Sequence, residues 1–434
     1  MSLARRRPTR ALGATAVVLA VLTALLVSLG SGQRARAAAS LTQVSNFGSN
    51  PGAIQMYDYV SAAAGTNAPL VVAMHGCTQQ ASDYYNDSGW PKYADLWGFD
   101  VVFPQQTSSN SSTECFDWYT SSDDTRGNGE AASIIQMVQY MQAHYSIDPK
   151  RIYVTGLSAG AGMTADLLAD YPDVFAAGSI DSGLPAQCAT GGQTTAYTCM
   201  DGAVNKTVAQ WAALATGSDP GYNGPWPRVA IWQGSSDYTV NTANFSELMD
   251  QWTGVWGISQ TASSTASLTG GTTESIYNDS AGKPAVETYQ ISGMGHGLAV
   301  NPGSGLTQCG ATGAYFLSYI CSTYYTAVFW GLDNGAGSPS PSASASASAS
   351  PSPSPSASPS KSASPSASPS STWTPKCFTE SNYQQTVDGH AYQSGGYTYA
   401  NGSNQNMGLW NTFATHTLEE TGPNYYVIAD THCP

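Results

Sequence analysis

The sequence predicts an α/β fold with helices on both faces of a mostly parallel sheet, followed by a small β-rich C-terminal module on a disordered linker. Two observations lead to this prediction. Across residues 40–334, apolar runs rich in β-branched residues alternate with helical patterns, which is typical of a parallel sheet covered by helices. Residues 335–376 are mostly Ser, Pro and Ala, a composition too poor in apolar side chains to form a core.

The elements of the first domain are expected in a regular order. Each expected strand is a short apolar run, and the clearest expected helix repeats its apolar residues at a spacing of three or four. We predict strands at 70–74, 100–103, 152–155 and 228–234, and helices at 93–97, 130–144 and 161–169.

The strand at 152–155 ends in a G-x-S-x-G motif, Gly156-Leu-Ser-Ala-Gly160, which passes directly into the next helix. This strand–turn–helix context is that of a nucleophile elbow, in which a serine lies on a strained turn. Glycines are needed on either side of the serine because the strand and the helix cross there without room for side chains. A five-residue pattern also arises by chance in loops, but the flanking elements favour Ser158 as a catalytic nucleophile.

A neutral serine is a weak nucleophile, so it needs a base and an acid that orients the base. In α/β-hydrolases these follow the serine in the order acid, then histidine, each just past a strand. Of three histidines in the first domain, His144 suits a helix end and His75 follows an early strand, whereas His296 lies downstream on a glycine-rich loop. We therefore predict His296 as the base. Asp237 is the preferred acid, and Asp181 is the alternative.

Acyl transfer also needs backbone N–H groups that stabilise an oxyanion. One donor is expected at Ala159, directly after the nucleophile, and the other at Cys77, in the loop His75-Gly76-Cys77. A bridge between Cys77 and Cys115 would hold that loop in place.

Other residues near these motifs carry weaker signals. Trp118 and Trp226 are candidates to line a substrate cleft, although a plain core position explains either tryptophan equally well. Glu130 and Arg126 flank the start of an expected helix and are interpreted as capping and surface charges rather than catalytic groups.

The N-terminus resembles a secretory signal peptide at residues 1–37, with a basic start, an apolar stretch and an A-x-A site at Ala35–Ala37. A retained anchor is the alternative, and paired arginines leave twin-arginine export open. The remaining chain has nine basic and 29 acidic residues, a net charge of −20. This charge argues against nucleic acid and anionic membranes as partners, so we expect no stable membrane association after signal removal.

Eight cysteines follow the expected signal peptide. An even number in an exported protein favours disulfides over metal binding, and no Cys/His cluster has zinc spacing. Sequence order suggests the pairs Cys77–Cys115, Cys188–Cys199, Cys309–Cys321 and Cys377–Cys433. The last pair would close the aromatic-rich module at 377–434, in which Gly395-Gly396 and Asn401-Gly402 mark turns between short strands.

Several motifs together resemble the secreted esterases of the poly(3-hydroxybutyrate) depolymerase family, relatives of feruloyl and acetylxylan esterases. The similarity spans about residues 47–333, and its motifs are His75-Gly-Cys-Thr-Gln79, Ser88-Gly-Trp90, Cys115-Phe-Asp-Trp-Tyr119, Gly127-Asn-Gly-Glu130, Gly156-Leu-Ser-Ala-Gly160, Trp226-Pro-Arg-Val229 and Gly293-Met-Gly-His-Gly297. The resemblance implies an α/β-hydrolase fold with Ser158, Asp237 and His296 as the triad. Cys77 and Ala159 would be the oxyanion donors. One departure is Gln233, where many relatives carry a histidine.

The resemblance implies a secreted, extracellular serine esterase that needs no metal or cofactor. Its substrate would be an insoluble polyester, most simply poly(3-hydroxybutyrate), and the alternative is a plant polysaccharide bearing feruloyl or acetyl esters. The segment 377–434 resembles the substrate-binding domain of some depolymerases, with Ser394-Gly-Gly-Tyr397 as one of its motifs. A third hypothesis, from another class, is a binding protein whose hydrolase domain has lost its activity.

Overall fold

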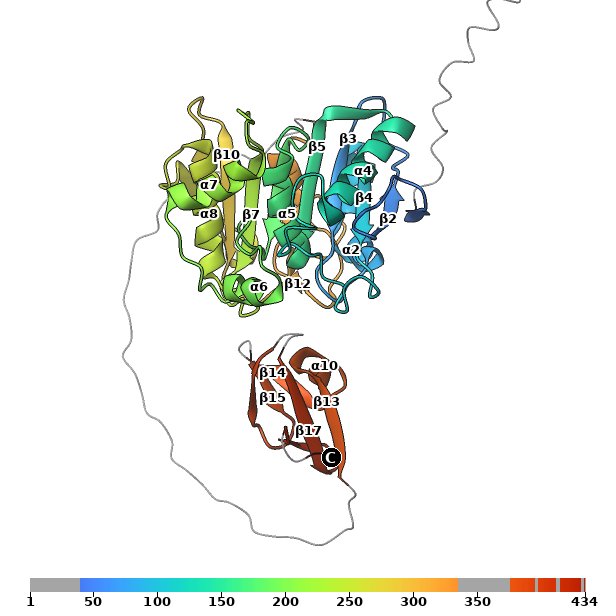
Figure 1. Cartoon of the computed structure of the whole chain (residues 1–434), viewed down its shortest axis with the longest axis vertical. Helices are drawn as coiled ribbons and strands as arrows, with labels where there is room; N and C mark the ends of the chain where they lie inside the picture. Colours follow the sequence, from blue (N-terminus) through green and yellow to red (C-terminus); the bar gives the residue numbers. More distant parts are fainter. Residues whose placement is uncertain (1–39, 335–374, 395–396, 411–413, 431–432, 434) are drawn as a thin grey trace, which may run out of the picture.

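The computed structural model describes residues 40–334 and 375–434, apart from 395–396, 411–413, 431–432 and 434 (Figure 1). The expected signal peptide at 1–37 lies outside the described residues, as does nearly all of the expected linker. No helix in the described part of the chain is long and apolar enough to cross a membrane.

A ten-stranded sheet forms the centre of the first domain, in the order β1-β2-β4-β3-β5-β6-β7-β10-β9-β8. The six strands from β4 to β10 in this order are parallel, and the outer strands at both edges are antiparallel. The strands are β1 Thr42–Val44, β2 Gln55–Tyr59, β3 Ala68–Met74, β4 Asp100–Gln105, β5 Ile147–Leu157, β6 Ala177–Asp181, β7 Arg228–Gly234, β8 Ser264–Leu268, β9 Thr272–Asn278 and β10 Pro284–Ile291. A mostly parallel sheet was predicted and is confirmed.

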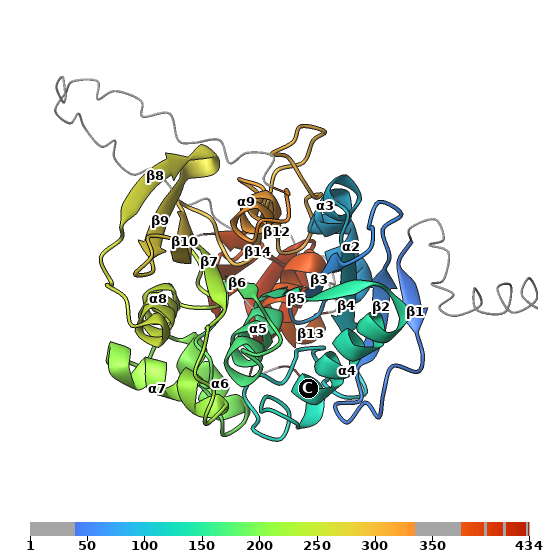
Figure 2. The ribbon, with the colours of Figure 1, turned by 90° about the horizontal axis from the view of Figure 1, so that it is seen from above.

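Helices cover both faces of this sheet, as the alternation in the sequence predicts (Figure 2). Alternate residues of the strands point to opposite faces, so Leu70 and Val72 lie in one buried cluster and Val71 and Ala73 in another. The first cluster packs under α4 Gly129–His144, α5 Ala159–Asp170 and α8 Ala243–Trp256, and the second under α2 Ala81–Asp87, α3 Trp90–Trp97 and α9 Ser322–Phe329. Two further helices, α6 Gln193–Met200 and α7 Val208–Ser218, and a small pair of strands, β11 Leu298–Val300 and β12 Phe316–Ser318, complete the domain.

The second unit consists of two three-stranded antiparallel sheets and one short helix. It contains β13 Lys376–Ser381, α10 Asn382–Val387, β14 Ala391–Ser394, β15 Tyr397–Ala400, β16 Asn406–Leu409, β17 Thr415–Gly422 and β18 Tyr425–Ile428. Its core is small, with Met407, Leu418 and Tyr426 among the few large buried side chains. A core of this size benefits from a covalent link, which the Cys377–Cys433 bridge supplies.

All four disulfides pair cysteines that follow each other in the sequence, as predicted. The bridge between Cys77 and Cys115 connects the loop after β3 to the loop after β4. Disulfides of this number are typical of proteins that fold in an oxidising compartment.

The crossing of β5 and α5 is the tightest contact between elements of the sheet and its helices. A Cβ atom added to Gly156 would lie 2.3 Å from the carbonyl oxygen of Gly160, and one added to Gly160 would lie 2.5 Å from that of His75. Both neighbours are backbone atoms, so a methyl group here would force the strand and the helix apart.

We therefore expect Gly156→Ala to lower the free energy of unfolding by roughly 1–3 kcal/mol, the usual cost of overpacking. Gly217→Ala is the matched control, because this glycine lies in α7 with no atom within 4 Å of an added Cβ. Gly217→Ala should raise the free energy of unfolding by roughly 0.5–1 kcal/mol, because alanine has less backbone freedom to lose when the helix forms. Urea unfolding followed by circular dichroism measures both. Equal stabilities of the two variants would contradict the steric argument.

Candidate active site

Ser158 lies on the sharp turn between β5 and α5. Its φ of 57° and ψ of −115° fall outside the regions that ordinary residues adopt, and such strain clusters at functional sites. Hydrogen bonds hold the turn: the Ser158 N–H donates to the Asp181 carbonyl at 3.0 Å, and its own carbonyl accepts the N–H groups of Ala161 and Gly162, each at 2.9 Å. The serine therefore lies at the N-terminus of α5, between strand and helix.

Asp237 and His296 are brought together by the order of the strands. Asp237 follows β7 and His296 follows β10, and these strands are parallel neighbours whose carboxyl ends meet at one edge of the sheet. His296 Nδ1 lies 2.8 Å from Asp237 Oδ2. The other carboxylate oxygen of Asp237 accepts the N–H groups of Thr239 and Val240 at 3.0 and 2.9 Å. The carboxylate is therefore buried and fixed, and it faces the imidazole.

The alternative residues are engaged elsewhere. The carboxylate of Asp181 accepts hydrogen bonds from Thr155 Oγ1 at 3.0 Å and Ser179 Oγ at 3.2 Å, and burial raises its pKa to about 7. His144 ends α4, with Nδ1 2.8 Å from the carbonyl of Tyr140. The geometry thus supports Asp237 over Asp181 as the partner of His296.

The two expected oxyanion donors border Ser158. Cys77 follows β3, and Ala159 is the first residue of α5. In the described part of the chain neither the Cys77 nor the Ala159 backbone N–H donates a hydrogen bond. A Cβ on Gly76 would lie 3.3 Å from the Cβ of Ser158, so the loop after β3 runs alongside the nucleophile.

His75 orients this loop from inside the protein. The Gln106 N–H donates to its Nε2 at 3.1 Å, so Nδ1 carries the proton and donates to the Gly76 carbonyl at 2.7 Å. Burial lowers the pKa of His75 to about 4, so the ring is neutral at physiological pH. In a trans peptide the Gly76 carbonyl and the Cys77 N–H point in opposite directions. Holding that carbonyl inward therefore directs the Cys77 N–H outward.

Glu130 belongs to the same buried network, which corrects the prediction that it is a surface or capping charge. Its side chain is fully buried and accepts hydrogen bonds from Gln106 Nε2 and, at 2.9 Å, from the Asp117 N–H. Burial raises the pKa of this carboxyl well above its ordinary range. Helical spacing could not reveal this, because the partners lie in the connection between β4 and α4, outside the helix. Arg126, by contrast, is half-exposed and pairs with Asp173 at 2.7 Å.

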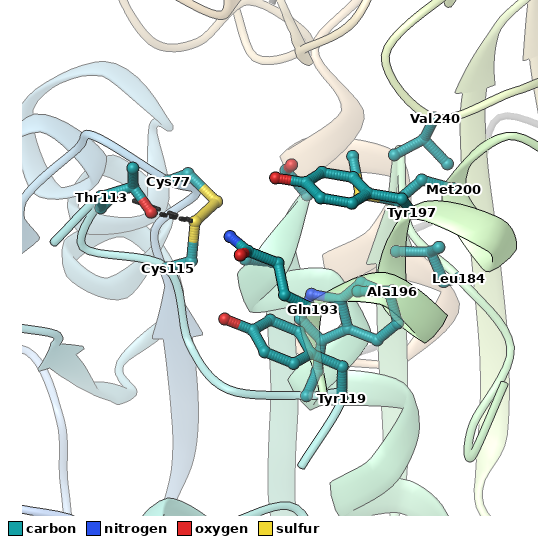
Figure 3. Close-up of a pocket in the computed structure, with 13 residues that line it drawn as sticks. Cys77, Thr113, Cys115, Tyr119, Leu184, Gln193, Ala196, Tyr197, Met200 and Val240 are labelled. Carbon is teal, nitrogen blue, oxygen red and sulfur yellow. Dashed lines mark hydrogen bonds between the residues drawn. A yellow bond between two sulfur atoms is a disulfide. The ribbon is translucent and has the colours of Figure 1, made fainter. Parts of the chain in front are cut away.

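A small cavity opens beside Ser158, between the Cys77–Cys115 bridge and helix α6 (Figure 3). Its volume is about 30 Å³, which is room for one or two water molecules. Aromatic, aliphatic and sulfur groups supply most of the lining. Its polar groups are the Gln193 amide and the hydroxyls of Thr113, Tyr119, Ser158 and Tyr197. The cavity suits a short apolar substituent of a substrate bound at the serine.

The two candidate tryptophans have different positions. Trp118 lines the cavity beside Ser158 while it packs against α5, where a Cβ on Gly162 would lie 2.6 Å from its Cγ. Trp226 precedes β7, at the end of this strand opposite to Asp237, and its ring contacts Tyr222. The structure therefore brings Trp118 to the other candidate residues and leaves Trp226 away from them.

Comparisons with known proteins identify the family of this chain. A family model described as Esterase PHB depolymerase matches residues 54–277. Poly(3-hydroxyalkanoate) depolymerase C of Paucimonas lemoignei is 52% identical over 294 residues, which cover 68% of this chain and 70% of that protein. Feruloyl esterase B of Talaromyces stipitatus is 38% identical, with 64% of this chain and 77% of that protein covered.

Two acetylxylan esterases are also similar. The enzyme of Coprinopsis cinerea is 37% identical, with coverage of 60% of this chain and 70% of that protein. The solved structure of an acetyl xylan esterase from Aspergillus awamori is 33% identical, with a TM-score of 0.55 and coverage of 59% of this chain and 94% of that structure. The chain therefore belongs to the Esterase PHB depolymerase family and is a carboxylic ester hydrolase with an α/β-hydrolase fold.

Proposed function

We propose that this protein is a secreted serine esterase that depolymerises a short-chain polyhydroxyalkanoate such as poly(3-hydroxybutyrate). Ser158 is the nucleophile, His296 the base and Asp237 the acid that orients the imidazole. The observation that carries the proposal is the 2.8 Å hydrogen bond between His296 and Asp237 at the edge of the sheet where the strained serine turn also lies.

The reaction follows from these positions. His296 Nε2 takes the Ser158 proton as Oγ attacks the ester carbonyl, and Asp237 stabilises the imidazolium through Nδ1. The N–H groups of Cys77 and Ala159 stabilise the oxyanion. The protonated His296 then gives its proton to the leaving alkoxide, and an acyl-enzyme remains on Ser158. Water, activated by His296, releases the acid product and restores the serine.

Two observations favour a polyester substrate. The relative with 52% identity is named as a poly(3-hydroxyalkanoate) depolymerase, whereas the relatives named as feruloyl and acetylxylan esterases are less similar. The cavity of about 30 Å³ beside Ser158 accommodates a methyl branch more readily than a feruloyl ring. Acetyl esters of xylan also fit this space, so they form the second candidate substrate.

The domain organisation belongs to the same proposal. Residues 1–37 are the signal peptide, residues 40–334 the esterase domain, residues 335–376 a Ser/Pro/Ala-rich linker and residues 377–434 a substrate-binding module. The four disulfides support export to an oxidising environment. A tether of this kind raises the effective concentration of the esterase domain at a solid surface.

The triad is tested by a matched pair of carboxylate substitutions. Asp237→Asn should lower kcat for p-nitrophenyl acetate by about 10³–10⁴-fold, because the imidazole loses its orienting partner. Asp181→Asn should stay within about tenfold of the native enzyme, since that carboxylate contacts Thr155 and Ser179 instead. Ser158→Ala defines the background rate. Wild-type activity of Asp237→Asn or of Ser158→Ala would overturn the assignment.

The role of the buried imidazole is tested by two isosteric replacements. His75→Asn keeps an amide donor near Nδ1 and should retain kcat within about tenfold. His75→Gln places its amide near Nε2, loses the bond to the Gly76 carbonyl and should lower kcat about 10²-fold with little change in KM, the signature of a displaced oxyanion donor. Equal losses of kcat in both variants would mean that the ring acts only by packing against Phe116.

The substrate is tested by two assays on the same enzyme preparation. We expect clearing of a poly(3-hydroxybutyrate) suspension and much slower release of ferulate or acetate from esterified xylan. Ser158→Ala controls for physical dispersion of the polymer. Faster release from xylan, with no clearing, would favour the polysaccharide esterase instead.

A further inference from the structure

Tyr315 connects the candidate base to the surface of the esterase domain. Its φ of 65° is rare for an aromatic residue. The segment that follows His296 fixes this conformation, because the Leu298 N–H donates to the Tyr315 carbonyl at 2.8 Å. A Cβ on Gly297 would lie 2.6 Å from that same oxygen. The ring of Tyr315 meets the His296 ring edge-on, with centroids 5.9 Å apart.

The outer face of Tyr315 is covered by the C-terminal module. Tyr383 of α10 stacks on it at 5.3 Å between ring centroids and 22° between ring planes, and Trp410 lies 6.0 Å away. The two module rings also contact each other at 5.5 Å, and Trp410 Nε1 donates to Thr386 Oγ1 at 2.9 Å, which fixes the indole. In Figure 1, α10 and β14 lie at the end of the module nearest the esterase domain.

A second cavity, of about 450 Å³, lies between the two domains. This volume is within the range of ordinary ligand sites. The esterase domain contributes three tyrosines, one leucine, His296, two hydroxyl side chains and two glycines, and the module contributes Gln393 and Trp410. No Asp, Glu, Lys or Arg is among the described residues that line it. The principal lining residues are His296, Tyr238, Leu317, Tyr319, Gln393 and Trp410.

We propose that the module docks on the mouth of the active site and completes a binding site for a segment of an uncharged aliphatic polyester chain. The inference rests on the proposed polyester activity. The small cavity beside Ser158 binds the substituent at the ester being cleaved, and the larger cavity binds the monomer units that follow this ester. Aromatic faces bind the apolar backbone, and the Gln393 amide offers a donor for an ester carbonyl. The module thus contributes to binding near the catalytic residues in addition to adsorbing to the solid.

The proposal is tested in the full-length protein with a water-soluble 3-hydroxybutyrate trimer, for which adsorption to a solid plays no part. Tyr383→Ala and Trp410→Ala should lower kcat/KM for the trimer about three- to tenfold, mainly through KM, as expected for a lost aromatic contact. Tyr383→Phe, which keeps the stacked ring, should behave as the native enzyme. Hydrolysis of p-nitrophenyl acetate, an ester too short to reach Tyr383 or Trp410, should fall less than hydrolysis of the trimer in both alanine variants.

Tyr425→Ala is the matched control on the same module. Tyr425 is 46% exposed, and the register of β13, β17 and β18 places it at the opposite end of their sheet from Ser381, which precedes Tyr383. This variant should leave trimer kinetics unchanged. Equal trimer kinetics for Tyr383→Ala, Trp410→Ala and Tyr425→Ala would overturn the proposal.

Hydrogen–deuterium exchange tests the docking of the module independently of the polyester substrate, because the measurement requires no substrate. Tyr383→Ala should speed exchange in peptides covering 293–300 and 313–319, whereas Tyr425→Ala should not. Unchanged exchange in Tyr383→Ala would overturn the docking. Faster exchange in an enzyme that clears no polymer and cleaves no trimer would instead retain the docking and reject the polyester substrate.

Discussion

The close crossing of β5 and α5 is the constraint on which the rest of the site depends. Backbone atoms of Gly156 and Gly160 approach so closely that no side chain fits between them. This contact forces the serine between strand and helix into a conformation with positive φ. It also presses α5 against the carbonyl of His75. The turn at Ser158 and the loop His75-Gly76-Cys77 are therefore in contact through α5, and a shift of either displaces both.

The order of the parallel strands is enough to bring Asp237 and His296 together. The loops after β7 and β10 are adjacent because these strands are neighbours, so Asp237 meets His296 although 59 residues separate them. The loop His75-Gly76-Cys77, which holds the proposed oxyanion donor Cys77, needs more support, since loops are more mobile than helices and strands. The Cys77–Cys115 disulfide and the buried His75 imidazole hold this loop, and Gln106, which contacts Glu130, donates its backbone N–H to that imidazole. Burying Glu130 is costly unless it is hydrogen-bonded, and its partners satisfy this requirement.

In the proposed function, the small cavity recognises the ester that is cleaved and the larger cavity recognises the units beyond it. The small one lies beside Ser158 between the disulfide and α6, where the proposed function has it bind the group attached at the reacting ester. The larger one is open and bordered by residues of both domains. A polymer differs from a small ester in the units beyond the cleaved bond, so the second cavity is where such a preference would arise. A surface without charged side chains suits a neutral chain better than an ionic one.

Local signals in the sequence predicted four of the six parallel strands, β3, β4, β5 and β7, together with the serine turn and the histidine on its glycine-rich loop. The order of the cysteines along the chain suggested their pairing. These depend on short motifs, on hydrophobic periodicity and on chain order. The parallel strands β6 and β10 and the antiparallel edge strands β1, β2, β8 and β9 were not predicted, because they are short or contain several polar residues and so lack the long apolar runs of β3 and β5. Only the tertiary structure shows that Asp237 contacts His296 while Asp181 contacts Thr155 and Ser179, that Glu130 is buried, and that Tyr315 lies between His296 and Tyr383. Each of these depends on contacts between segments far apart in the chain, which local sequence patterns do not encode.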